Sequence, residues 1–249
     1  MTSVLGRRNP AVKVALLFAV SVVTLFLTDP YPLLILYGSA LAAIRLGARV
    51  RWRTLLTAQL PFLAFGVGLV AVNALSRPGR DLLPELPVRV TAEGVTFGVA
   101  LALRGLVIGV LTIGFLASTP PRDLMISLVR QARLSPRYAY AILAGHRMLQ
   151  AMPNRWSTIR AAQAVRGPVR LGGRPRFGPR QFARAAFALL VASIRSSERT
   201  ALALETRGLG DGPRTVWRPV PFGPADLVLA AAVAVAVALV LIGFAVLAG

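Results

Sequence analysis

Hydrophobic residues gather in five blocks along the chain, each nearly free of charge. A helix needs roughly 20 apolar residues to cross the hydrocarbon core of a bilayer. The blocks approach or reach that length, and they predict five transmembrane helices at residues 11–27, 31–47, 55–75, 96–118 and 226–248. Only residues 28–30 separate the first two blocks, so these two helices should form a tight hairpin.

The region between residues 119 and 222 is too polar to lie in a membrane and shows helical periodicity of its own. Pro120 and Pro121 predict the start of a short amphipathic helix, because proline is favoured in the first turn. Ser135-Pro136 should end it. Two long helices are then expected, over about 137–166 and 180–207.

Each long helix carries a stripe of positions three or four residues apart that should face the other helix. On the first helix the stripe consists of Tyr138, Ile142, Gly145, Leu149, Met152, Trp156, Ile159, Gln163 and Arg166. On the second it is mostly small, which allows a close crossing, and consists of Ala186, Leu189, Ser193, Ser196, Thr200, Ala203 and Arg207. The opposite face of the second helix is apolar enough to rest against a bilayer or the spans, with Phe187, Leu190, Ile194 and Ala201.

The pattern predicts an all-α integral membrane protein with about five transmembrane helices and a cytoplasmic insert of one short and two long crossed helices. A hydrophobic content of 55% fits that class. Residues 1–118 should hold the first four spans, residues 119–222 the insert, and residues 223–249 the last span. Because 18 arginines lie in the insert, the positive-inside rule places the insert and the N-terminus in the cytoplasm and the C-terminus outside.

The net charge of +20 comes almost entirely from arginine, since Lys13 is the single lysine. Basic chains often bind nucleic acid. Here the bases follow the cytoplasmic ends of the spans, and membrane topology with contact to anionic lipid explains them, so no nucleic-acid partner is expected. The chain contains no cysteine, which excludes disulfides and thiolate metal sites.

Candidate catalytic residues are few. The chain has one histidine, His146, and nine acids, none of them in a paired-carboxylate cluster. It has neither a glycine-rich phosphate loop nor a nucleophile elbow. No bound metal or cofactor and no enzymatic activity are therefore expected. The alternative from a different class, a membrane enzyme of lipid or isoprenoid metabolism, would need clustered acids facing the cytoplasm.

Both long helices end on Arg-Gly. One closes with AAQAVRG at Gly167, and the other closes with ALETRG at Gly208. The simplest interpretation is a helix stop, in which glycine takes the left-handed conformation and the arginine faces the negative end of the helix dipole. Arg166 and Arg207 also belong to the contact stripes of their helices, which favours a second role in binding a partner.

Arg104 is a charge inside the fourth predicted span. Such a charge is costly unless its side chain reaches the interface or pairs within the bundle. Two interpretations stay open, namely extension to the outer interface and pairing with Asp29 or Glu93. Asp226, at the entrance of the last span, is expected to act as an interfacial helix cap.

The chain resembles the transmembrane T component of energy-coupling factor transporters, also called the cobalt-transport permease family. The resemblance covers nearly the full length. It rests on NPAVKVALLF at the first span, ALALRGLVIGVLTIGFLASTPPRDL at the fourth, RMLQAMPNRWSTIRAAQAVRG in the first long helix, and ERTALALETRGLGDGPRTVWRPVPFGPADL before the last span.

The resemblance implies a non-catalytic scaffold in the cytoplasmic membrane of a prokaryote. In that family the T component links two cytoplasmic ABC ATPase subunits, which bind the ATP, to a small membrane protein. This small protein, the S component, captures a vitamin or transition-metal ion. A permease subunit of another ABC system is the nearest alternative. Which substrate is carried, whether the scaffold serves one S component or several, and whether the ATPase pair is a homodimer or a heterodimer stay open.

Carried over by motif, the ATPase-docking residues are Val165, Arg166, Gly167, Thr206, Arg207 and Gly208. Supporting positions on the same helices are Gln163, Ala164, Ala203 and Glu205. The commonest family form is Ala-Arg-Gly, and Val165 and Thr206 occupy the alanine positions here. This departure is mild, and it bears on how well these motifs fit a particular ATPase pair.

Overall fold

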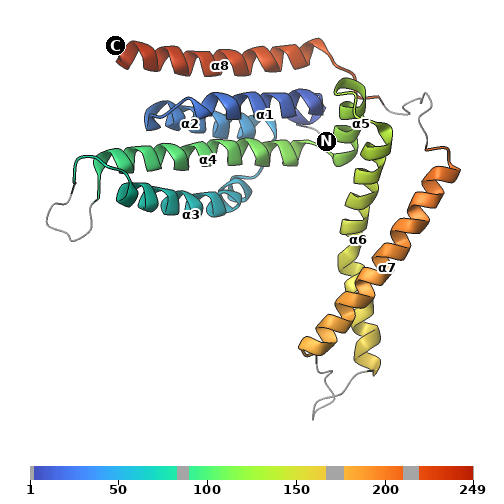
Figure 1. Cartoon of the computed structure of the whole chain (residues 1–249). Coiled ribbons are helices and arrows are strands. Elements are labelled where there is room, and N and C mark those ends of the chain that lie inside the picture. Colours follow the sequence, from blue (N-terminus) through green and yellow to red (C-terminus); the bar gives the residue numbers. More distant parts are fainter. Residues whose placement is uncertain (1–2, 83–89, 167–176, 210–218, 249) are drawn as a thin grey trace. The chain divides into compact units, whose positions relative to one another are not determined.

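The computed structural model describes residues 3–82, 90–166, 177–209 and 219–248 (Figure 1). These residues form helices, and no β-strand occurs among them. The elements are η1 (Leu5–Arg7), α1 (Pro10–Leu25), α2 (Pro30–Gly47), α3 (Trp52–Ser76), α4 (Ala92–Ser118), α5 (Pro121–Gln131), α6 (Pro136–Arg166), α7 (Pro179–Thr206) and α8 (Pro224–Ala248). The predicted all-α fold is confirmed.

Three of these helices, α3, α4 and α8, are long and apolar enough to cross a membrane. Helices α1 and α2 occupy the first two predicted spans but have only 16 and 18 residues. Sixteen residues rise about 24 Å, less than the roughly 30 Å of a hydrocarbon core. Helix α1 ends at Leu25 and Pro30 begins α2, so the first two blocks are separated close to the predicted turn. These apolar helices make the chain a multi-pass membrane protein.

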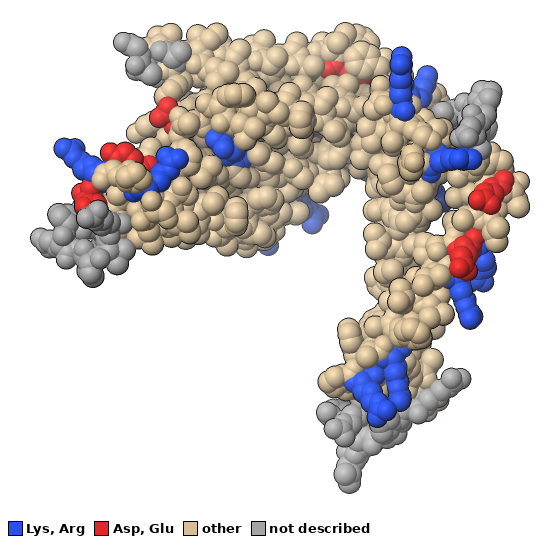
Figure 2. Space-filling view, viewed as in Figure 1, with Lys and Arg blue, Asp and Glu red and all other residues tan. Residues whose placement is uncertain are grey.

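The chain forms two compact units, one from Met1–Ser127 with Pro219–Gly249 (unit 1) and one from Leu128–Arg218 (unit 2). In unit 1, α4 is central and packs against α1, α2 and α3, while α8 packs on α1 and α2 (Figure 1). The visible flank of unit 1 is largely uncharged, with acids and bases gathered near the ends of its helices (Figure 2). Most of its described buried apolar residues form three small clusters, around Leu55 and Val110, around Leu36 and Val107, and around Leu33 and Ala100.

Glycines set the close approach of α3 and α4. A Cβ atom placed on Gly98 would lie 2.7 Å from the Cα atom of Val70 and 3.3 Å from two α3 carbonyl oxygens. A Cβ on Gly66 of α3 would lie 2.9 Å from that of Ala102. Helices in a membrane associate largely by packing, and small residues permit the short backbone distance.

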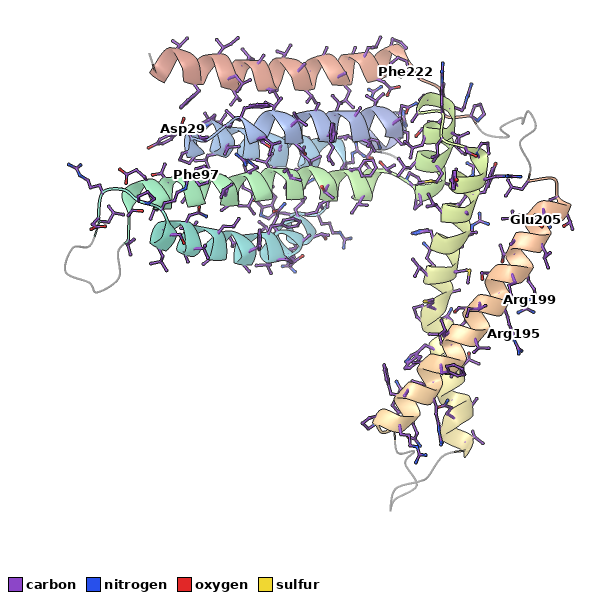
Figure 3. All side chains as sticks on the ribbon, viewed as in Figure 1. Asp29, Phe97, Arg195, Arg199, Glu205 and Phe222 are labelled. Carbon is purple, nitrogen blue, oxygen red and sulfur yellow. The ribbon has the colours of Figure 1, made fainter. Side chains whose placement is uncertain are left out.

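Arg104 of α4 binds the end of α1. Its Nη2 atom donates to the carbonyl oxygens of Leu27, at 3.0 Å, and Leu25, at 3.4 Å. Of the two open interpretations, pairing with Asp29 or Glu93 is not found among the described residues, since Arg104 contacts main-chain carbonyls. The Glu93 carboxylate accepts from the main-chain N–H of Arg80 instead, and Asp29 lies at the turn between α1 and α2 (Figure 3).

The physical reason lies in the short first helix. The last carbonyls of a helix have no partner within it, and a bilayer offers no water to replace one. The guanidinium supplies both a donor and a positive charge at the negative end of the α1 dipole. The sequence indicates only acidic partners for Arg104, because no residue type marks a free main-chain carbonyl.

Replacing Arg104 by leucine should therefore destabilise unit 1. The Arg104→Leu variant leaves the Leu25 and Leu27 carbonyls without this donor, at a cost of about 1–3 kcal/mol. Thermal unfolding in detergent measures the loss. Arg104→Lys should keep part of the stability, and Arg53→Leu, which removes an exposed arginine from α3, is the control. A leucine variant as stable as the unmodified protein would contradict the capping role.

Candidate functional site

Helices α6 and α7 of unit 2 form an antiparallel pair. Gln163, near the end of α6, lies beside Gln181 and Ala185 at the start of α7. Tyr140, near the start of α6, and Arg207, at the end of α7, line one groove. The C-terminal ends of the two helices therefore lie at opposite ends of the pair, separated by about 40 Å for helices of this length.

The helices are joined at their crossing by polar and aromatic contacts. Arg155 donates to the hydroxyl of Ser196 at 2.9 Å. The Trp156 ring meets Phe182 and Phe177 edge-on, with ring centroids 5.4 and 6.4 Å apart. These contacts hold the C-terminal half of α6 against α7 and the residues just before it.

Gln163 extends this contact with its side-chain amide. Oriented to satisfy both neighbours, the amide donates to the Gln181 carbonyl at 3.1 Å and accepts from the Ala185 N–H at 3.2 Å. Ala185 is completely buried beside it. This one polar side chain of α6 thus contacts two main-chain groups one helical turn apart on α7.

The predicted stripe of α7 is confirmed over its second half, because Ser196, Thr200, Ala203 and Arg207 all line the groove against α6. The stripe of α6 is only half correct. Its C-terminal part contacts α7 through Trp156 and Gln163, but its N-terminal part is exposed at Tyr138, Ile142 and Leu149.

The spacing of the α6 stripe explains this error. A helix has 3.6 residues per turn, so a stripe that repeats every 3.5 residues drifts by about 20° per heptad. Supercoiling would keep such a stripe on the partner. These helices diverge instead, and the groove meets a neighbouring face of α6 that includes Leu143, Arg147 and Met148.

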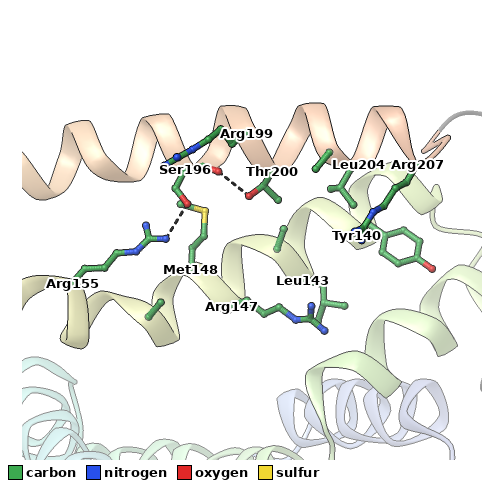
Figure 4. Close-up of a pocket in the computed structure, with 13 residues that line it drawn as sticks. Tyr140, Leu143, Arg147, Met148, Arg155, Ser196, Arg199, Thr200, Leu204 and Arg207 are labelled. Atoms are coloured by element: carbon green, nitrogen blue, oxygen red, sulfur yellow. Dashed lines mark hydrogen bonds between the residues drawn. The ribbon is translucent and has the colours of Figure 1, made fainter.

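The diverging ends of α6 and α7 enclose a groove of about 500 Å³ (Figure 4). Four arginines line it and no acid does, and the other lining residues are small or apolar. The lining consists of Tyr140, Leu143, Ala144, Arg147, Met148, Ala151, Arg155, Ser196, Arg199, Thr200, Ala203, Leu204 and Arg207. A groove of this composition suits an acidic protein surface with some apolar area.

Three of the groove arginines were not identified from the sequence. Arg147 and Arg155 lie eight residues apart on α6, and Arg199 and Arg207 lie eight apart on α7. Eight residues are slightly more than two turns, so each pair lies on one face of its helix. The matching spacing of the two pairs was a signal that could have revealed this basic lining.

The end of α7 is built as a helix stop. Gly208 has φ +75°, in the left-handed region that favours glycine. Its N–H donates to the Glu205 carbonyl at 2.8 Å, and the Leu209 N–H donates to the Leu204 carbonyl at 2.9 Å, which together make a Schellman motif. The predicted stop at Gly208 is confirmed.

The stop also fixes the place of Arg207. This residue is the C-cap of α7, is exposed, and lies at the mouth of the groove. Thr206 before it is exposed, and its hydroxyl donates to the Ala203 carbonyl at 3.2 Å. Glu205 is exposed near the same end (Figure 3).

The other Arg-Gly motif lies at the end of α6. Arg166 is the last residue of α6, as predicted, and Gly167 lies outside the described residues. The Val165 side chain is 88% exposed, and Ala164 is half-buried.

A larger residue at Ala185 should separate the two long helices. Ala185→Leu adds volume where no exposed surface is left, and overpacking of this kind costs about 1–3 kcal/mol. Limited proteolysis of the full chain in detergent measures it, as faster cleavage within unit 2. Ala183→Leu, on the exposed side of the same helix, should cleave at the original rate. Equal cleavage of both variants would mean that Ala185 is not packed at the crossing.

The fold and the paired helices define a class: an α-helical, multi-pass membrane protein with a polar two-helix insert. The family model described as CbiQ, cobalt transport protein, matches residues 1–216. The chain belongs to this family, and it is therefore a transport protein rather than an enzyme.

One curated relative is a putative ABC transporter ATP-binding protein of Bifidobacterium longum (strain NCC 2705). It is 27% identical over 244 residues, which cover 93% of this chain and 31% of the relative. The chain thus spans about a third of the length of that relative.

Proposed function

We propose that this chain is the energy-coupling scaffold, or T component, of an energy-coupling factor ABC importer for a vitamin or transition-metal ion. It would join two ATP-binding subunits to a small substrate-capturing S component in the cytoplasmic membrane. The observation that carries the proposal is the antiparallel pair α6 and α7, whose arginine-bearing ends lie at opposite ends of the pair.

Two separated arginine ends suit two separate partners. Arginine presents a planar set of donors to carboxylates or carbonyls, and these charge-assisted bonds are strong when water is excluded. Because the two ends are about 40 Å apart, one subunit can bind at Arg166 and the other at Arg207. The basic groove beside Arg207 adds to the surface that such a subunit would meet.

The Bifidobacterium relative supports ATP-binding partners. It is named as an ATP-binding protein, and only 31% of its length aligns with this chain. We infer that the relative combines a region like this chain with ATP-binding regions in one polypeptide. In the proposed assembly, the ATP-binding subunits bind the ATP, and the scaffold itself binds no cofactor.

The outer face of α7 supports a membrane partner. Phe187, Leu190 and Ile194 are exposed on the side of α7 opposite its contact stripe. An apolar face of this kind is usually covered, and the S component together with the bilayer surface would cover it. In this arrangement the N-terminus and unit 2 face the cytoplasm and the C-terminus lies outside, as the arginine distribution predicts.

Purification from the native membrane tests the proposal. The protein is tagged at its C-terminus, extracted in mild detergent, and the material that accompanies it is identified by mass spectrometry. Recovery of one or two nucleotide-binding subunits and a small polytopic membrane protein is expected, and the ligand of that small protein identifies the substrate. Recovery of the chain alone, while other membrane complexes stay intact, would contradict the scaffold role.

A further inference from the structure

Unit 1 contains the chain up to Ser127, which lies within α5, and again from Pro219 onward. In this unit, α4 ends at Ser118 and α8 begins at Pro224. The N-terminal segment 9–13 makes buried hydrogen bonds near both points. These points are more than 100 residues apart in the sequence.

Lys13 makes the bonds to α4. It is the single lysine of the chain and is only 6% exposed, which is uncommon for lysine. Its Nζ atom donates to the Ser118 carbonyl at 3.1 Å, to the Ser118 hydroxyl at 3.2 Å and to the Leu5 carbonyl at 3.1 Å. An ammonium group has three donors, and all three are used here.

Asn9 and Asp226 make the bonds to α8. The Asn9 N–H donates to Asp226 Oδ1 at 2.9 Å, and the Asn9 amide donates to the Pro221 carbonyl at 3.3 Å. Asp226 Oδ2 accepts from the Gly223 N–H at 3.0 Å, and Asn9 Oδ1 accepts from the Ala11 N–H at 2.9 Å. Both residues are buried. Asp226 was expected only to cap α8, but it also joins α8 to the first helix.

We propose that Asn9, Lys13 and Asp226 form a latch that holds the end of α4 and the start of α8 to the first helix, so that movement imposed on unit 2 by ATP-binding subunits reaches the membrane helices through α1. The inference rests on the proposed function. Breaking a buried hydrogen bond leaves its donor or acceptor without a partner, which costs free energy. When Ser118 or Asp226 is displaced slightly, the N-terminal end of α1 therefore moves with it and the bonds stay intact. The other end of α1 is held to α4 by Arg104.

The latch is tested on the complex purified with its ATP-binding subunits. The chain has no cysteine, so Tyr31→Cys provides one site on this chain for a spin label, attached before the chain is combined with its ATP-binding subunits. Tyr31 is exposed and lies at the start of α2, just beyond the far end of α1. The spectrum is recorded with and without ATP, and ATP hydrolysis is measured on the same sample.

Lys13→Met and Asp226→Ala should retain the subunits and ATP hydrolysis but reduce the nucleotide-dependent spectral change by about fivefold or more. If Lys13→Met alone does not fold, the double variant Lys13→Met with Ser118→Ala replaces it in the test. It removes the Nζ donor and the hydroxyl acceptor together, so the hydroxyl is not left buried without a partner. Lys13→Arg should restore part of the response. Arg7→Met and Asp29→Ala remove an exposed base and an exposed acid at a helix start, and should respond fully.

An unchanged spectral response in both the Asp226→Ala and the double variant would overturn the latch. The result would leave the scaffold role intact, because the subunits would still be bound and active. If the unmodified chain failed to retain ATP-binding subunits, the proposed function would be refuted, and the latch with it.

Discussion

Reversing the charge at Arg207 is expected to weaken the binding of one ATP-binding subunit by roughly 10- to 100-fold. The arginine is exposed at the end of α7, where a charge-assisted hydrogen bond to a partner contributes about 1.5–3 kcal/mol. Arg207→Glu removes that bond and adds repulsion against the acidic surface that the basic groove predicts. Arg166→Glu should have the same effect at the end of α6. The measurement is the amount of each subunit that co-purifies, followed by titration of the purified subunits.

Arg195→Glu is the matched control for these variants. Arg195 is exposed on the same helix as Arg207 (Figure 3) but does not line the groove. Arg195→Glu therefore changes the net charge as much as Arg207→Glu does, without altering the groove. Helix α7 should still end at Gly208, because its stop is made by main-chain bonds. Membrane insertion should be unaffected. Full subunit binding by both the Arg166→Glu and Arg207→Glu proteins would show that these residues serve only as helix ends.

Replacing Gly98 by leucine is expected to separate α3 from α4. Even a Cβ atom at this position meets the main chain of α3 at 2.7 Å, and a main chain cannot rotate away as a side chain can. Overpacking typically costs about 1–3 kcal/mol, and a backbone contact should place Gly98→Leu at the upper end. For a chain of this size the unfolding midpoint should fall by roughly 5–10 °C. Thermal unfolding in detergent, followed by circular dichroism, measures it.

Gly105→Leu separates this effect from the general consequences of adding leucine to α4. Gly105 lies on the same helix, two turns further along, and a Cβ atom there meets nothing within 4 Å. Its substitution should leave the midpoint close to that of the unmodified protein. If both variants lost the same stability, the loss would come from the helix itself and not from contact with α3.

The sequence predicted those features that depend only on residues close together along the chain. Apolar blocks and arginine-rich regions indicate a membrane protein regardless of how its helices pack. Proline begins α5, α6 and α7, and Gly208 ends α7, because proline and glycine restrict or free the backbone at their own positions. The stop of α7 at Gly208, the short helix and the two long helices were therefore predictable from local patterns.

Only the tertiary structure decided which side chains meet. The partner of Arg104 is a pair of main-chain carbonyls, which no residue type in the sequence reveals. The face that α6 turns to the groove depends on its divergence from α7, and the hydrogen bonds of Asn9 to Asp226 join positions 217 residues apart. Local preference specifies where a helix begins and ends, whereas the pairing of distant polar groups depends on which of them are buried together, and that is a property of the packed helices as a whole.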